Sequence, residues 1–439
     1  MAGTLQIVPV RAGDVSEAYL AGADRFVHGY FTGRPQALRF HIDVENAATH
    51  KMTESVSEAG ALLASMDSAA RRIDPAARTF STSNEPAVEA WGREDYERAV
   101  AIDPDFGDAW LSWIESLARK GDPADAMGVA DRALARAGLR SPLTRARIEL
   151  VAATLRKDPA AEQQGLTRLA ELLPADTAVV ANLAQVEMRA RNFTGAAAQY
   201  RKLLAAGPHN AEVMNSLGYA EGFAGDLDAA RKTLEAYGRE PGQKANSLDS
   251  TGEVLFVNGK FLEAEKYFLD AHQTAPSFLG GADLWKAAYA RWLGGDLRGA
   301  DAILARYLEF RRNAHDPMAG WREASWDYST GRRDQAIEKL RNAGGAPGPM
   351  IERQLALWQG KVETRNNLAE LKQKYEQTQP TADAQVRVFY ASALLADGQK
   401  EEARKLLARW PLPAENDGDP LVESLVFPKF IELRKAAGL

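Results

Sequence analysis

A glycine followed five residues later by an alanine recurs along this chain at a nearly constant interval. The clearest copy lies in "GKFLEAEKYFLDAHQTAP", where Gly259 precedes Ala264. The corresponding alanines from residue 196 onward lie at positions 196, 230, 264, 300 and 336, in steps of 34, 34, 36 and 36 residues. A period of this length indicates stacked copies of one small structural unit. The sequence therefore predicts a solenoid of repeats.

Each repeat is predicted to be two antiparallel helices joined by a tight turn. Gly259 marks the turn, because glycine adopts the left-handed conformation at a helix end without a side-chain clash. Ala264 lies in the second helix, where its small side chain lets two backbones approach closely. Phe268 lies one turn further along the same face and fills the space between the helices. Pro276 ends the unit, and "NSLDSTGEVLFVN" supplies its first helix.

These positions resemble the tetratricopeptide repeat (TPR) family. The resemblance is carried most fully by Leu248, Gly252, Leu255, Ala264, Phe268, Ala271 and Pro276. It implies a mainly α fold, a right-handed α-solenoid of about nine helical hairpins over residues 86–415. Four units depart from the pattern. Those at Ala161 and around residues 350–376 are degenerate, and in the Ala300 and Ala336 units Ala288 and Ala324 replace the glycine of the first helix.

Residues 1–80 do not follow the period and are predicted to form a small α/β module. We expect strands at "TLQIVPV" (4–10), "ALRFHIDVE" (37–45) and "HKMTESVSE" (50–58), and helices at 15–31 and 58–73. The order of these elements resembles the TolB-amino-terminal-like module that precedes TPR arrays in some bacterial kinases and cyclases. At the other end, residues 416–439 are predicted to form a capping helix, because a stacked array leaves its last apolar face uncovered.

Composition excludes several classes of function. The chain has 54 Lys and Arg against 60 Asp and Glu, a net charge of -6, which argues against a nucleic-acid binder. It has no cysteine, so disulfides and thiolate metal sites are excluded. Neither a signal peptide nor a membrane-spanning run is apparent. We therefore expect a soluble, cytoplasmic protein, with the periplasm as the alternative if a signal or anchor has been removed.

Catalytic motifs are absent from the sequence, so we predict no enzyme activity, no catalytic residues and no cofactor. The one cluster of possible metal ligands is "HIDVE", where His41, Asp43 and Glu45 alternate onto one face of a strand and His50 follows. A solvated polar sheet face has the same pattern. No metal site is predicted, and a metal-dependent activity of the N-terminal module stays open as an alternative.

The TPR resemblance implies that ligands bind along the concave groove lined by the first helix of each repeat. The corresponding residues in this chain are Asn215, Tyr219, Asn246, Trp285, Lys286, Tyr289, Trp292, Trp321, Arg322 and Tyr328. The aromatic members are predicted either to form a binding patch or to pack between helices. We predict a non-catalytic scaffold that binds an extended peptide or protein segment. Binding of a glycan or small molecule on the aromatic side chains is the alternative, and the oligomeric state is left open.

Overall fold

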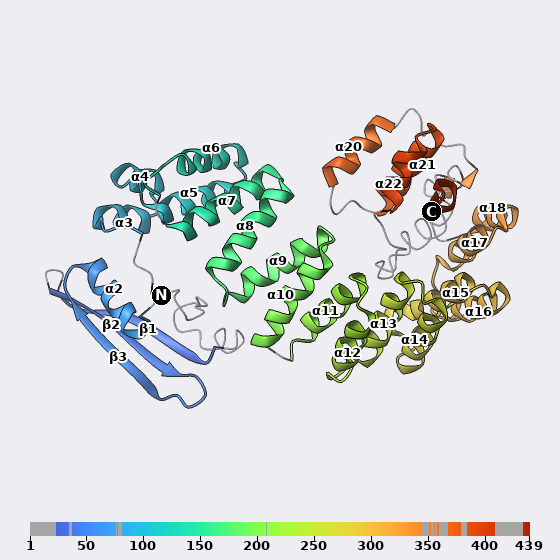
Figure 1. The fold of residues 1–439 in the computed structure, drawn as a ribbon, viewed down its shortest axis with the longest axis horizontal. Helices are drawn as coiled ribbons and strands as arrows, with labels where there is room; N and C mark the ends of the chain where they lie inside the picture. The colour runs from blue at the N-terminus through green and yellow to red at the C-terminus, as the bar shows by residue number, and fades with distance from the viewer. Residues whose placement is uncertain are drawn as a thin grey trace. The chain divides into compact units, whose positions relative to one another are not determined.

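The structure is a computed structural model that describes residues 23–34, 37–75, 77, 81–139, 141–207, 209–344, 351–352, 355, 358–359, 368–378, 384–408 and 433–439. The chain forms two compact units, residues 1–186 and residues 187–439, and each is described by itself. Figure 1 labels the helices and strands. The predicted domain boundaries at residues 80, 86 and 415 stay predictions.

The N-terminal unit begins with a three-stranded antiparallel sheet in the order β1-β2-β3. The strands are β1 (Arg25–Arg34), β2 (Ala37–Asn46) and β3 (Met52–Ala59), and helix α2 (Leu62–Ile73) packs against β2 and β3 (Figure 1). Alternation along β2 explains this packing, because Phe40, Ile42 and Val44 are buried on one face. The second and third predicted strands and the second predicted helix are therefore confirmed.

The helix predicted over residues 15–31 is wrong in its second half, where the chain forms β1. The sequence of β1, "RFVHGYFTGR", is rich in aromatic and β-branched residues that favour strands. It also pairs with β2 along its whole length, from Arg25 opposite Asn46 to Arg34 opposite Ala37. This pairing overrides the helical spacing of its apolar residues. Residues 15–22 and the predicted strand at 4–10 lie outside the described residues.

Helical hairpins follow the sheet. The helices before the division between the units are α3 (Glu85–Gly92), α4 (Tyr96–Ile102), α5 (Gly107–Lys120), α6 (Pro123–Leu134), α7 (Pro142–Arg156) and α8 (Pro159–Leu172), and α9 (Thr177–Arg189) contains the division. Helix α3 pairs with α4, α5 with α6, and α7 with α8.

The second unit continues the hairpins (green to red in Figure 1). Its described elements are α10 (Phe193–Ala206), α11 (Ala211–Phe223), α12 (Leu227–Tyr237), α13 (Lys244–Val257), α14 (Phe261–Thr274), the short 3-10 helix η1 (Phe278–Gly281), α15 (Ala282–Leu293), α16 (Leu297–Asn313), α17 (Ala319–Ser329), α18 (Arg333–Asn342), α20 (Leu368–Thr378), α21 (Ala384–Ala396) and α22 (Lys400–Ala408). Helices α11 to α18 pair as four consecutive hairpins, so the chain is an α-solenoid of TPR-type hairpins with a small N-terminal sheet.

The recurring glycine stands at the turn of most hairpins, as predicted, and Glu94, Lys157 and Arg191 take its place at three turns. Gly259 has φ 73° and Gly331 has φ 88°, both in the left-handed region that other residues adopt only with strain. The repeat that begins with Arg191 lacks this glycine, yet Arg191 takes the same conformation, with φ 62°. The turn therefore keeps its geometry where its usual residue is missing.

Small residues let the two helices of a hairpin approach closely. In the hairpin of α13 and α14, Ala264 is fully buried, and a Cβ atom added at Gly252 would lie 2.6 Å from the ring of Phe268. In the hairpin of α11 and α12, a Cβ atom at Gly218 would lie 2.4 Å from the side chain of Leu234. The positions that carry the TPR resemblance are thus positions of close packing between the helices.

Part of the predicted capping helix is described at the end of the chain. Residues 433–437 are helical, and Leu433 and Ala437 are buried against Leu406 and Leu407 of α22. The rest of the predicted helix, residues 416–432, lies outside the described residues.

Replacing Gly252 by alanine is expected to lower the free energy of unfolding by about 1–3 kcal/mol, because the new methyl group overlaps the buried Phe268 ring. Gly128→Ala, in the interior of α6, is the matched control, because a Cβ atom at Gly128 meets no atom within 4 Å. The control should gain about 0.5–1 kcal/mol from helix propensity. Urea unfolding followed by circular dichroism measures both, and equal effects of the two variants would contradict the close approach.

Candidate functional site

The residues predicted to bind a ligand lie on α11, α13, α15 and α17, the first helices of four consecutive hairpins (Figure 1). Asn215 and Tyr219 of α11, Asn246 of α13 and Trp292 of α15 are half-buried. The other predicted residues are buried. The structure thus places the ten residues on corresponding helices, but most of them do not present a free surface.

Most of the predicted aromatic residues pack inside the protein. The exposed fractions of the buried ones are 4% for Trp285, 1% for Tyr289, 0% for Trp321 and 3% for Tyr328. The Tyr289 ring lies 5.1 Å from that of Trp326, and the Tyr328 ring is stacked 4.4 Å from that of Trp358. The sequence left open whether these side chains form a binding patch or pack between helices. In this structure these four rings are packed between helices. The flat faces that a sugar would need on these four rings are covered.

Arg322 is also occupied by the fold. Its side chain is 3% exposed, and its Nε atom donates to the Asp316 carboxylate at 3.1 Å. The same carboxylate accepts a hydrogen bond from Arg311 at 2.7 Å. Both guanidinium groups keep the pKa of Asp316 below its ordinary value, although burial opposes them. Arg322 therefore ties the start of α17 to the preceding turn.

A buried ionic cluster surrounds Lys286 of α15. The Lys286 ammonium donates to both carboxylate oxygens of Asp249 on α13, at 2.8 and 2.9 Å, and to Glu253 at 2.5 Å. An ammonium group has three donors, so these contacts use all of them. Lys286 is 8% exposed and both acids are 2% exposed. The cation predicted to hold an acidic ligand is thus neutralised within the protein.

Tyr219 connects α11 to this cluster. Its hydroxyl donates to the second carboxylate oxygen of Glu253. Burial raises the pKa of Tyr219 well above its ordinary value, and the neighbouring carboxylates raise it further. Burial also raises the pKa of Glu253 to about 8, against the opposing effect of Lys286. The cluster therefore joins three consecutive inner helices through side chains that are buried or half-buried.

Asp283, in the first turn of α15, adds a third carboxyl group to the cluster. It is 0% exposed, and neither of its carboxylate oxygens has a hydrogen-bond donor. Burial, the charge of Asp249 and the hydrogen bond that a protonated Asp283 can donate to Asp249 together raise the pKa of Asp283 to about 9. We name Asp249, Glu253, Asp283, Lys286 and Tyr219 the acid cluster.

A half-buried strip on α11 lies beside the acid cluster. Asn215, Tyr219 and Phe223 succeed one another at turn spacing, and we name them the α11 strip. The Phe223 ring lies 5.6 Å from the Tyr219 ring and 5.2 Å from that of Phe193 at the start of α10. The Oδ1 atom of Asn215 is recessed and has no hydrogen-bond donor. The strip therefore combines an unused acceptor with partly exposed rings.

Asn246 is hydrogen-bonded to the preceding repeat. Its Nδ2 atom donates to the Tyr237 hydroxyl at 2.9 Å, and that hydroxyl donates in turn to Gln243 at 2.6 Å. Asn246 thus anchors the start of α13 to the end of α12, and it offers less free hydrogen-bonding capacity than Asn215.

The possible metal ligands of β2 do not converge. His41 and Asp43 lie on the open face of the sheet, but the His41 ring is hydrogen-bonded to Thr32 at 2.6 Å and Asp43 accepts from Ser55 at 2.6 Å. Glu45 is hydrogen-bonded to His50 at 2.8 Å. Among the described residues, no three His, Asp or Glu side chains are grouped as a metal ion requires. The pattern "HIDVE" is that of a solvated sheet face.

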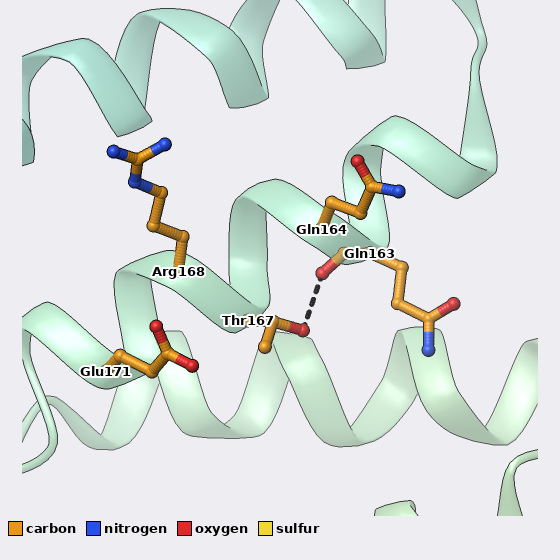
Figure 2. A pocket seen from close by; sticks show the side chains of 5 residues that line it. All are labelled: Gln163, Gln164, Thr167, Arg168 and Glu171. Carbon is orange, nitrogen blue, oxygen red and sulfur yellow. Dashed lines mark hydrogen bonds between the residues drawn. The ribbon is translucent and has the colours of Figure 1, made fainter.

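A hollow of about 620 Å³ on the surface of α8 does not enclose a site. Its lining residues all belong to this one helix, and they are Gln163, Gln164, Thr167, Arg168 and Glu171 (Figure 2). One helix cannot surround a ligand, and Thr167 is hydrogen-bonded to the backbone oxygen of Gln163 at 2.8 Å.

None of the described helices combines the length and the apolar character needed to cross a bilayer.

Sequence reasoning missed the role of Asp283 and the pairing of Lys286. A signal was present, because Asp283 and Lys286 are charged residues three positions apart in a helix whose first nine residues are otherwise apolar, "ADLWKAAYA". Such a pair lies on one face of the helix. In the preceding repeat, Asp249 and Glu253 are four positions apart and share a face of α13.

Comparisons with known proteins give similarity in fold at low identity. No family model matches the chain, and neither does any curated protein. The crystal structure of MamA is 16% identical over 39% of this chain and 92% of that chain, with a TM-score of 0.32. The structure of Naa15/Naa10 bound to HypK-THB is 13% identical, covers 74% of this chain and 62% of that chain, and has a TM-score of 0.36. A tetratricopeptide repeat protein from Parabacteroides merdae is 15% identical over 68% of this chain and 99% of that chain, with a TM-score of 0.33.

Trp321→Ala is expected to destabilise the protein by about 3–5 kcal/mol, because it empties a fully buried site. Leu262→Ala is the control, since Leu262 is 55% exposed and its loss should change stability by less than about 0.5 kcal/mol. Urea unfolding followed by circular dichroism compares the two. If Trp321→Ala kept the stability of the unchanged protein, its ring would not belong to the core.

Lys286→Met is expected to lower the free energy of unfolding by about 3–5 kcal/mol at pH 8, because it leaves buried carboxylates without a cation. The loss should be smaller at pH 5, because burial raises the pKa of Glu253 to about 8 and a protonated Glu253 needs no cation. Lys266→Met, at an exposed position of α14, controls for loss of a lysine. An equal loss at both pH values would show that the lysine acts by packing alone.

Proposed function

We propose that this chain is a non-catalytic interaction protein, and that the α11 strip holds an extended segment of a protein partner. The observation that carries the proposal is the unused acceptor of Asn215 beside the half-buried rings of Tyr219 and Phe223. An extended segment has backbone N–H groups that lack partners, and it presents side chains on alternate sides. The Asn215 acceptor suits a backbone N–H group of the segment, and the two rings suit its side chains.

Asn215 is the polar contact in this arrangement. Its Oδ1 atom can accept a backbone N–H of the segment, which removes the cost of a buried acceptor without a donor. Tyr219 takes no part through its hydroxyl, which Glu253 occupies, but its ring and that of Phe223 supply contact area. Aromatic anchors of this kind usually contribute most of the binding energy of an interface.

The other residues predicted from the sequence support the site from within. Lys286 and Arg322 neutralise buried acids, and the rings of Trp285, Tyr289 and Trp321 pack between helices. They hold α13, α15 and α17 in place. The proposal therefore moves the contacts with the partner toward α11, and it assigns the later repeats to rigidity.

The test uses a phage-displayed library of unconstrained peptides, selected on the full-length protein. Peptides that bind should lose at least about tenfold in affinity to the variants Asn215→Ala and Phe223→Ala, a loss of about 1.4 kcal/mol. Leu262→Ala, on the second helix of another hairpin, should bind them unchanged. Circular dichroism should show that all three variants keep the fold.

Two outcomes would contradict the proposal. The selected peptides could bind both strip variants as tightly as the unchanged protein, which would place their site elsewhere. Alternatively, the protein could select no peptides and yet bind members of a glycan array, which would favour the carbohydrate alternative.

A further inference from the structure

The acid cluster contains three carboxyl groups and a single cation. Lys286 spends its three donors on Asp249 and Glu253, and Glu253 receives a further hydrogen bond from Tyr219. Asp283 is left with buried oxygens that no donor reaches. A buried carboxylate without a cation or a donor is strongly unfavourable. The acid cluster therefore lacks one hydrogen-bond donor.

A proton on Asp283 supplies that donor. The neighbouring Asp249 carboxylate has lone pairs beyond those that Lys286 uses, so it can accept a hydrogen bond from a protonated Asp283. With this proton the chain Asp283, Asp249, Lys286, Glu253, Tyr219 runs from α15 through α13 to α11 with a donor for each acidic side chain. Without the proton, two carboxylates face each other in a space closed to water.

We propose that the acid cluster is a proton-operated latch, in which a proton held between Asp283 and Asp249 fastens α15 to α13 and is released when these helices separate. The latch belongs to the helices themselves and does not depend on whether the α11 strip binds a segment. In an opened state Asp283 meets water and returns to the behaviour of an ordinary aspartate. Opening therefore becomes more populated as the pH rises.

The direction of the pH dependence follows from the pKa of Asp283 in the closed and the open state. Its pKa is about 9 in the closed arrangement and 3.8 in water. The closed state holds a proton on Asp283 that the open state loses throughout that interval, so Asp283 favours opening by about tenfold for each pH unit. Glu253, whose pKa is raised to about 8 in the closed arrangement, acts in the same direction, and a comparison with Asp283→Asn removes its share because both proteins retain it. The stabilisation is complete below pH 3.8, and it falls as the pH rises toward 9.

Other groups near α15 do not supply the missing charge or donor. On α14, Glu265 is hydrogen-bonded to Arg291 at 2.8 Å. On α16, Arg311 donates to the backbone oxygen of Gly280 in η1 at 2.9 Å. His272 of α14 lies against the Phe310 ring, and burial lowers its pKa. The test therefore compares variants that all retain His272.

The experiment measures hydrogen exchange of the full-length protein by mass spectrometry, on peptides covering α13 and α15, from pH 5 to pH 8. The protection of the unchanged protein, corrected for the intrinsic exchange rates, should fall relative to that of Asp283→Asn as the pH rises. The expected fall is about tenfold for each pH unit. Asparagine has nearly the shape of the protonated acid and keeps a donor for Asp249. Asp270→Asn, at an exposed position of α14, should follow the unchanged protein.

A constant ratio of protection between Asp283→Asn and the unchanged protein across this pH range would overturn the latch. A second measurement needs no variant, in case Asp283→Asn does not fold. Infrared difference spectra of the unchanged protein at pH 7 and above pH 9 should show a protonated carboxyl group that disappears at the higher pH. If no protonated carboxyl group is present at pH 7, the proposal fails.

Discussion

The whole repeat array depends on one packing constraint, the close approach of two helix backbones within each hairpin. Ala264 and Gly252 have almost no side chain where α13 and α14 meet, and the Phe268 ring fills the space that they leave. Close packing of this kind gains dispersion contacts and excludes water. Because each hairpin repeats the arrangement, the first helices are brought side by side, and their side chains must either pair or pack.

The sequence was sufficient to predict the hairpins, because their packing depends on residues at fixed spacing. The turn glycines, the buried alanines and the strands β2 and β3 lie where their patterns indicate. The error at residues 25–31 has another origin. There the apolar residues suit either a helix or a strand, and the choice is made by pairing with β2, a partner that lies beyond the local sequence.

The candidate site was less predictable, since it depends on which side chains the folded helices bring together. Lys286 looks like a free cation in the sequence, and only the neighbouring helix shows that Asp249 and Glu253 surround it. The aromatic residues of α15 and α17 looked like a binding surface for the same reason. Periodicity shows which way a side chain points along its helix, but not what covers that face.

The left-handed turn at Lys157, between α7 and α8, shows which part of the repeat the fold requires. A lysine at this position bears a strain that glycine would avoid, so the packing of α7 on α8, rather than local preference, sets the turn. A repeat can therefore lose its turn glycine and still keep its two helices packed. The residue at the turn is thus a weaker marker of such a repeat than the small buried residues between its helices.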